Sequence, residues 1–262
     1  MAENIIVIVR EVWDTRDLVG GVLDEAGNIK PGAMQTRFEP EDLNALEMAL
    51  RAKDAQGAKV TAVSVGEPGP VDVLRECLYR GVDAVHRVEG DPKAMDDQAM
   101  AARLAGAIRT IGMPDLILVG TTILDGENGL LGAMLAAQMG LDEVSYVDAL
   151  ESLGGGKAVG KRAIEMGYES VEAACPAVFC VGVALLEDDP RAPRSAKAML
   201  KLKLKKAPIP VVSATDAGAA AARTTEVLKM EAIPPRAIES RPVDPENEAE
   251  LRAMLNDVLK GA

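Results

Sequence analysis

The sequence predicts an α/β fold in which helices flank a wound, mostly parallel sheet, followed by a strand-rich segment and an extended C-terminal arm. Three observations predict this class. Short apolar runs alternate with longer segments of helical periodicity, which is the order of strand–helix–strand units. The apolar runs are continuous, as expected of strands buried on both faces of a parallel sheet. After Val144 the rhythm changes, and strand-like segments follow one another.

The first strand–helix unit occupies residues 5–57. Residues 5–9 form a β-branched run, and a loop rich in glycine and proline follows them. Pro40 then opens a helix that has acidic residues in its first turn, where they suit the helix dipole. Gly57 ends this helix. Its apolar stripe is formed by Leu43, Leu46 and Leu50.

Further units follow in the same order. The predicted strands are residues 60–65, 84–88 and 116–119. The predicted helices are about 71–81, 96–111 and a segment that ends at Gly140. Such alternation favours right-handed crossovers and a parallel sheet of the Rossmann-like, adenine-nucleotide-binding type.

The second half of the chain is organised differently. Strands are expected at residues 145–150, 171–174 and 177–185, with a glycine run at 154–156 among them. From residue 190 the chain is rich in proline and lysine, and a last helix is expected at 245–259. The predicted division is a nucleotide-binding domain at 1–189 and a partner-recognition loop with a C-terminal arm at 190–262. Such a tail either wraps a partner or forms a disordered linker.

Composition excludes several classes of protein. The net charge of -12 and the 2% aromatic content oppose nucleic-acid binding, which needs clustered cations and stacking platforms. No uncharged run reaches the roughly 20 residues of a membrane span. The apolar stretch near the N-terminus is too short for a secretory signal, so a cytoplasmic location is expected. Cys77, Cys175 and Cys180 form no Cys-x-x-Cys pattern, and buried thiols are expected.

Side chains suited to catalysis are scarce. The only histidine, His86, lies beside a short apolar strand, where a structural or surface role is expected. The sequence contains no nucleophile–histidine–acid pattern, metal-ligand cluster or Gly-Lys-Ser phosphate loop. We therefore predict no catalytic residues and no metal. The expected role is to bind and carry another molecule rather than to catalyse a reaction with side chains.

The segment GTTILDGENGLLG, residues 120–132, is the most informative for function. It joins a buried strand to a helix, and ligands of open parallel sheets bind at the carboxyl ends of strands. A glycine-rich entry lets the helix N–H groups approach phosphate oxygens. Asp125 and Asn128 either bond sugar hydroxyls or cap the helix, and an ordinary capped loop is the alternative interpretation.

Several separated stretches together resemble one family, the β subunit of electron-transferring flavoproteins. VIVREVWDT is similar to its first strand and turn, and EPEDLNALEMALRAKD to its first helix. VTAVSVGEP with LRECLYRGVDAVHRVE resembles the second unit. PDLILVGTTILDGENGLLG resembles the family's nucleotide loop, and CPAVFCVGVAL with DDPRAPRSAKAM resembles its later strand and recognition segment.

The resemblance implies a heterodimer with an α subunit that carries most of an FAD site. It also implies a second nucleotide in the β subunit, which is AMP in simple carriers and FAD in electron-bifurcating members. In the bifurcating members NADH donates a hydride to that flavin. A dehydrogenase or other redox partner is expected to dock near residues 190–199.

Matched by position, the resemblance implies the following site residues. The nucleotide site comprises Ile8, Val9, Glu39, Ser64, Val65, Gly66, Gly120, Thr121, Thr122, Asp125, Gly126, Glu127, Asn128, Gly129, Leu130, Leu131 and Gly132. The partner-binding segment comprises Pro190, Arg191, Arg194, Ser195, Ala196, Lys197 and Met199.

The chain departs from the family pattern at a few of these positions. Leu130 and Leu131 stand where the family has glutamine and its neighbour, and Glu39 replaces the asparagine before proline. Fewer side-chain hydrogen bonds to a nucleotide are therefore expected, and the helix N–H groups remain.

Two questions stay open at the level of sequence. The alternative function is an AMP- or ATP-binding signalling module without a redox role, built on the same sheet. The segment LKLKLKK is either a solvated strand with one apolar side or a basic helix, and its charge serves either an acidic partner or a solvated face.

Overall fold

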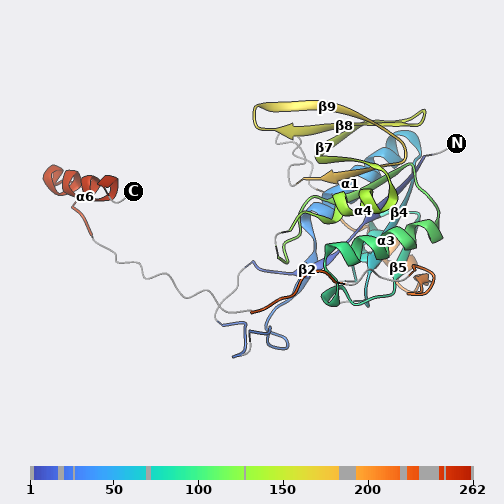
Figure 1. Ribbon diagram of the computed structural model, residues 1–262, viewed down its shortest axis with the longest axis horizontal. Helices are drawn as coiled ribbons and strands as arrows, with labels where there is room; N and C mark the ends of the chain where they lie inside the picture. The colour runs from blue at the N-terminus through green and yellow to red at the C-terminus, as the bar shows by residue number, and fades with distance from the viewer. Residues whose placement is uncertain are drawn as a thin grey trace.

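A nine-stranded sheet forms the centre of the chain in a computed structural model (Figure 1). The structure describes residues 3–16, 21–25, 27–68, 72–126, 128–182, 193–218, 223–229, 242–244 and 246–260. The strand order is β11-β5-β4-β1-β6-β10-β7-β8-β9. The strands from β11 to β7 are parallel, and β8 and β9 add an antiparallel end. The predicted α/β class is confirmed.

Strand β1 (Asn4–Ile8) lies near the middle of the sheet, between β4 (Lys59–Val65) and β6 (Leu116–Gly120). Both neighbours are parallel to β1, as expected for strands that are apolar throughout. The remaining parallel strands are β5 (Ala84–Val88), β10 (Ala177–Val181), β7 (Asp142–Gly154) and β11 (Val211–Val212).

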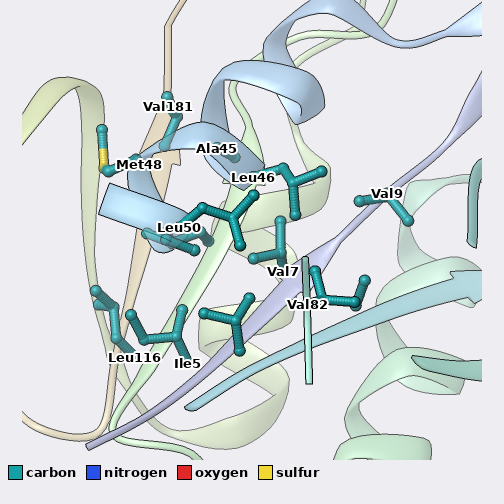
Figure 2. Packing of buried hydrophobic residues seen from close by; sticks show 14 of the residues in the cluster. Ile5, Val7, Val9, Ala45, Leu46, Met48, Leu50, Val82, Leu116 and Val181 are labelled. Atoms are coloured by element: carbon teal, nitrogen blue, oxygen red, sulfur yellow. The ribbon is translucent and has the colours of Figure 1, made fainter. Parts of the chain in front are cut away.

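Helices cover both faces of this sheet. Helices α1 (Pro40–Gln56) and α2 (Val73–Arg80) share one core cluster with Ile5, Val7 and Val9. Helices α3 (Asp97–Ile111) and α4 (Leu131–Met139) share the other with Ile6 and Ile8. The division follows from the strand period of two, which points successive side chains to opposite faces. Figure 2 shows the first cluster, where Leu46 and Leu50 of α1 pack on β1.

The antiparallel end of the sheet differs from the sequence prediction. Strand β8 (Lys157–Ile164) was not predicted, and it pairs with β7 and with β9 (Gly167–Ala174). Its sequence, KAVGKRAI, is polar because much of this hairpin is exposed, so no continuous apolar run marks it. The strand expected at 177–185 is described as far as Val181, since residues 183–192 lie outside the described part.

Two short elements lie where only a loop was predicted. Strands β2 (Glu11–Trp13) and β3 (Thr36–Phe38) pair antiparallel and bring the end of β1 back to the start of α1. Their pairing depends on residues more than 20 positions apart, which local periodicity does not reveal. One turn of 3-10 helix, η1 (Pro92–Ala94), lies between β5 and α3.

The chain after residue 193 remains attached to this body up to residue 218. The basic segment is a helix, α5 (Ala198–Leu204), which packs on α2, so the helical alternative is the one realised. Helix α6 (Glu248–Lys260) confirms the predicted last helix and lies well apart from the body (Figure 1). Within the described residues, no helix has both the length and the apolar character needed to cross a membrane.

Candidate functional site

The carboxyl ends of β1, β4 and β6 meet at the point where the strand order reverses. The chain proceeds from β1 outward to β4 and β5, and then returns to the opposite side of β1 as β6. Open parallel sheets bind ligands in the crevice outside such a switch point. The predicted residues Val9, Ser64 and Gly120 all lie at these strand ends. The sequence prediction and the topology therefore select the same edge.

Three acidic residues at the start of α1 hold the first part of the loop that follows β6. An Asp42 carboxylate oxygen accepts from the Gly120 N–H at 2.9 Å. The Glu41 carboxylate accepts from the Thr122 N–H, and the Glu39 carboxylate accepts from the Leu124 N–H at 3.0 Å. Because every second N–H group from 120 to 124 is bonded in this way, the protein itself satisfies this stretch.

Arg10 neutralises part of this charge. Its guanidinium is paired with Asp42 through Nε and Nη2 at 2.8 Å, in the bidentate geometry that favours strong ion pairs. Nη2 also donates to the carbonyl oxygen of Thr122 at 2.9 Å. The pair is largely buried, with side-chain exposures of 15% for Arg10 and 0% for Asp42. Arg10 thus links the ends of β1 and β6 to α1.

The second part of the loop, at the start of α4, differs in the partners of its backbone N–H groups. Helix α4 begins at Leu131 with no side-chain cap among the residues that the structure describes. The first N–H groups of a helix have no intrahelical partner, and among the described residues no side chain at the N-cap position bonds those of α4. One of its neighbours, the Leu130 N–H, interacts with the Asp97 carboxylate at the start of α3.

Thr121 lies within the first part and carries an unsatisfied side-chain oxygen. Its side chain is 9% exposed, and its Oγ1 is buried without a hydrogen-bond partner in the described protein. A buried hydroxyl without a partner costs free energy. The hydroxyl and the uncapped helix start together fit a polar ligand with a phosphate, whereas the carboxylate-held stretch 120–124 offers it no free N–H group at 120, 122 or 124.

Glycines in the loop serve close packing within the protein. A Cβ at Gly132 would lie 2.1 Å from Sγ of Cys180, so glycine lets α4 approach β10. A Cβ at Gly129 would lie 2.9 Å from the Thr121 carbonyl oxygen. Gly126 has a φ of +98°, which glycine adopts readily. The absence of a side chain at Gly129 and Gly132 therefore allows the loop and the start of α4 to pack this closely.

Asp125 bonds neither a helix N–H group nor Asn128. Its carboxylate accepts from the backbone N–H of Trp13 at 3.1 and 3.2 Å, which joins the loop to the β2–β3 hairpin. Among the described residues, Leu130 rather than Asp125 or Asn128 occupies the N-cap position of α4. Asn128 contributes its carbonyl oxygen to the Ile123 N–H, and Glu127 lies outside the described residues.

The end of β4 is also internally bonded. The Gly66 N–H donates to Val88 and its carbonyl oxygen accepts from Arg87 Nη1 at 3.0 Å. A Cβ at Gly66 would lie 2.8 Å from Pro92. Ser64 is buried and Val65 is partly buried beside it. This wall is rigid.

Burial shifts the pKa values of several carboxyl groups at this edge. It raises the pKa of Glu39, an effect to which Asp42 adds. Burial likewise raises the pKa values of Asp97 and Asp125, and nearby cations oppose this. Burial lowers the pKa of His86 on β5. Burial therefore favours the protonated forms of these three carboxyl groups, and the Arg10 charge opposes this at Glu39 and Asp97.

The partner-binding segment is divided between internal and exposed side chains. Arg194 bonds Glu47 at 2.8 Å and Asp54 at 2.7 Å on α1, and Ala196 packs on the core. Ser195 and Lys197 are exposed, and Met199 is 63% exposed. Pro190 and Arg191 lie outside the described residues.

Comparison with known proteins decides the family. Residues 33–217 match the model of the electron transfer flavoprotein domain, a span that contains α1, the loop after β6 and α5. The chain belongs to the electron transfer flavoprotein family.

Individual relatives agree with this assignment. The chain is 32% identical over 177 residues to the electron transfer flavoprotein subunit beta of Thermoanaerobacterium thermosaccharolyticum, covering 67% of this chain and 66% of that protein. It is 30% identical over 181 residues to the caffeyl-CoA reductase-Etf complex subunit CarD of Acetobacterium woodii, covering 68% of each. Protein FixA of Azorhizobium caulinodans is 30% identical over 222 residues, covering 82% of this chain and 76% of that protein.

Membership confirms the resemblance to β subunits and supports an electron-transfer role over the signalling alternative. The structure adds site residues that the sequence analysis did not single out, namely Arg10, Glu41, Asp42 and Asp97. Two features of the sequence could have pointed to these residues. One is a charged residue directly after a buried strand, and the other is an acidic run at the start of a helix.

Proposed function

We propose that the chain is the β subunit of a heterodimeric electron transfer flavoprotein, which carries electrons between a dehydrogenase, or NADH, and another redox partner through FAD. The family match carries this proposal, because residues 33–217 include the loop at the switch point and every strand of the nine-stranded sheet except β1. The relatives include a subunit of a caffeyl-CoA reductase-Etf complex and the acryloyl-CoA reductase electron transfer subunit gamma, which is consistent with a carrier that works within larger complexes.

The edge of the sheet beside α4 is proposed to hold an adenine nucleotide. The N–H groups that begin α4 would bind a phosphate, and Thr121 Oγ1 would gain the partner it lacks. AMP and FAD share the adenosine phosphate that such a site recognises. A bound flavin supplies the electron chemistry, while the chain holds it in place and excludes water. Arg10 and the three α1 carboxylates fix the strand ends against which the ligand rests.

Two exposed apolar surfaces are proposed to contact the α subunit. Helix α6 stands apart from the body, and Leu251, Met254, Leu255 and Leu259 recur on one side of it at helical spacing. At the β8–β9 turn, Met166 is 94% exposed and Ile164 and Tyr168 are also exposed. An amphipathic helix without an intramolecular partner is typical of a chain that docks on another. The exposed residues Ser195, Lys197 and Met199 are proposed to face a redox partner instead.

The proposal predicts a yellow heterodimer in the cytoplasm. Co-expression with an α subunit should yield a stable 1:1 complex, and denaturation should release measurable FAD. One FAD with one AMP per complex identifies the simple carrier type, and two FAD the bifurcating type. A colourless chain that stays monomeric beside the α subunit would refute the proposal.

A matched pair of variants tests the role of α6. Leu255→Glu should weaken the heterodimer by about tenfold or more, since a charge would replace an apolar contact at the interface. Arg252→Glu, on the same helix, is the control, because Arg252 is polar and pairs with Glu248 within α6. If both variants bind the α subunit with equal affinity, α6 is not part of the interface.

A further inference from the structure

The indole of Trp13 lies at the edge of the sheet that is proposed to hold a nucleotide. Within the described segments that join β1 to α1, β4 to α2 and β6 to α4, it is the one aromatic ring with partial exposure. Phe38, the other ring in these segments, is 8% exposed and belongs to the core. The planar ring of a nucleotide stacks favourably on an aromatic side chain. Trp13 is the side chain placed to provide such a surface here.

Backbone bonds hold Trp13 beside the loop that follows β6. Its N–H donates to both carboxylate oxygens of Asp125, at 3.1 and 3.2 Å. Within that loop the Ile123 N–H donates to the Asn128 carbonyl oxygen at 3.2 Å, so the loop turns back between Asp125 and the start of α4. On β3, Thr36 is the residue paired with Trp13. Because these bonds to Trp13 involve its backbone, a change of its side chain leaves them in place.

Lys93 lies over the indole. Its Nζ is 5.5 Å from the centroid of the Trp13 ring, within the range of about 6 Å for a cation–π contact. Lys93 belongs to η1, and η1 rests on the end of β4, where a Cβ at Gly66 would lie 2.8 Å from Cγ of Pro92. The contact therefore runs from the extension of β1 to the loop after β5, across the carboxyl end of β4.

The charge of Lys93 is available to a ligand. Arg10 is paired with Asp42 and Arg87 with Asp72, whereas exposed Lys93 forms no ion pair within the part of the chain that the structure describes. A cation–π contact at an exposed site is weak, and a bond to a phosphate oxygen is charge-assisted and stronger. Lys93 can therefore exchange the indole for a phosphate.

We propose that Trp13 and Lys93 form the ring-binding half of the nucleotide site, in which Trp13 stacks on the ring of the ligand and Lys93 attracts its negative charge. The inference rests on the proposed nucleotide at this edge, and neither residue is among those that the sequence implied. The ligand recognised is a planar heterocycle joined to a phosphate. AMP offers adenine alone, and FAD offers adenine and isoalloxazine. The start of α4 and Trp13 then bind opposite ends of one ligand.

Tryptophan emission of the heterodimer, depleted of the β-site nucleotide, tests the stacking. Trp13 is the only tryptophan of the chain, and Trp13→Phe removes its emission but keeps a ring. The difference between wild type and this variant therefore isolates the emission of Trp13. Stacking quenches indole emission, so that emission should fall on addition of AMP if adenine stacks on Trp13. It should fall only with FAD if the isoalloxazine stacks there. Either result supports the subsite, and the pair identifies the ring.

Affinity provides an independent measurement. Trp13→Leu keeps the N–H that bonds Asp125 but removes the flat ring, so the Kd of the quenching nucleotide, measured by equilibrium dialysis, should rise about tenfold. Trp13→Phe should stay within about threefold of wild type, because it still offers a ring. Lys93→Gln should raise the Kd about threefold, and less at high salt.

Lys201→Gln is the matched control. Lys201 also lies near an aromatic ring, with its Nζ 6.0 Å from the centroid of Tyr79, but it belongs to α5. Tyr79 is in the last turn of α2, which leads away from the carboxyl end of β4. Its Kd for AMP or FAD should equal that of wild type.

Two results would overturn the inference, and they can be told apart. If the wild type binds AMP or a second FAD while the emission of Trp13 and the Kd of Trp13→Leu stay unchanged, the ring of the ligand lies elsewhere and the nucleotide site itself stands. If the wild type binds neither AMP nor a second FAD, the proposed nucleotide site fails and the subsite fails with it.

Discussion

The two parts of the loop after β6 differ in what satisfies their backbone N–H groups. From Gly120 to Leu124, carboxylates of α1 take alternate N–H groups, and Arg10 balances part of the charge. From Leu130 onward the helix start has no side-chain cap among the described residues. The backbone of the first part is bonded within the protein, while the second part is where we propose that a ligand binds. One motif in the sequence therefore divides into two segments with different hydrogen-bond partners.

Removing the central carboxylate should disrupt the support most strongly. Asp42→Asn would leave Arg10 buried beside an uncharged partner, which costs about 3 kcal/mol in the free energy of unfolding. Denaturant unfolding of the purified chain measures this. Asp142→Asn, at an exposed strand start, is the control and should cost less than about 0.5 kcal/mol. Equal losses would show that the Arg10–Asp42 pair is not a structural centre.

The second largest loss of stability is expected at the start of α4, because this helix packs closely against β10. Gly132→Ala would place a methyl group 2.1 Å from Cys180 Sγ, so α4 must move away from β10. We expect a loss of about 2 kcal/mol in unfolding free energy and weaker nucleotide retention. Ala137→Ser, on the exposed side of α4, is the matched control. Unchanged stability would mean that the helix start does not need this contact.

Thr121→Val should change the stability of the chain and its retention of a nucleotide in opposite directions. Valine removes the buried hydroxyl that has no partner, so the chain without ligand should gain up to about 1 kcal/mol in stability. Nucleotide release from the heterodimer should become about fivefold faster, because the ligand loses one hydrogen bond. Thermal unfolding and release kinetics test the two halves of this prediction. A stabilised chain with unchanged release would place the hydroxyl outside the ligand site.

The smallest effect concerns the pH dependence of Glu39. Burial raises the pKa of this carboxyl, so the native chain binds its proton more tightly than the unfolded chain does. The stability that Glu39 contributes is full below its ordinary pKa and is lost as the pH rises through the raised value. Glu39→Gln lacks this loss, and its amide oxygen can still accept from Leu124. Between about pH 4 and 7, its stability relative to wild type should therefore rise, by within about 1 kcal/mol. A difference that is flat with pH would show that Glu39 ionises normally.

Much of this arrangement was predictable from residues alone. Continuous apolar runs such as residues 5–9 and 116–119 identify buried parallel strands because both faces must be apolar. Pro40 and Gly57 bounded α1 correctly, since proline starts helices and glycine ends them. The loop at 120–132 could be located for the same reason, because strand, glycine and helix occur in that order.

Only the tertiary structure decided how the loop is used. The partners of Gly120, Thr122 and Leu124 lie about 80 positions earlier in the chain, on α1, and Arg10 reaches them from β1. Likewise, Asp96 meets Thr224 across more than 120 residues. Local periodicity records which face of an element is apolar, but it does not record which distant polar groups meet. The sequence by itself therefore determined the parallel part of the sheet and the segment that joins β6 to α4, and the folded chain determined which distant side chains bond that segment.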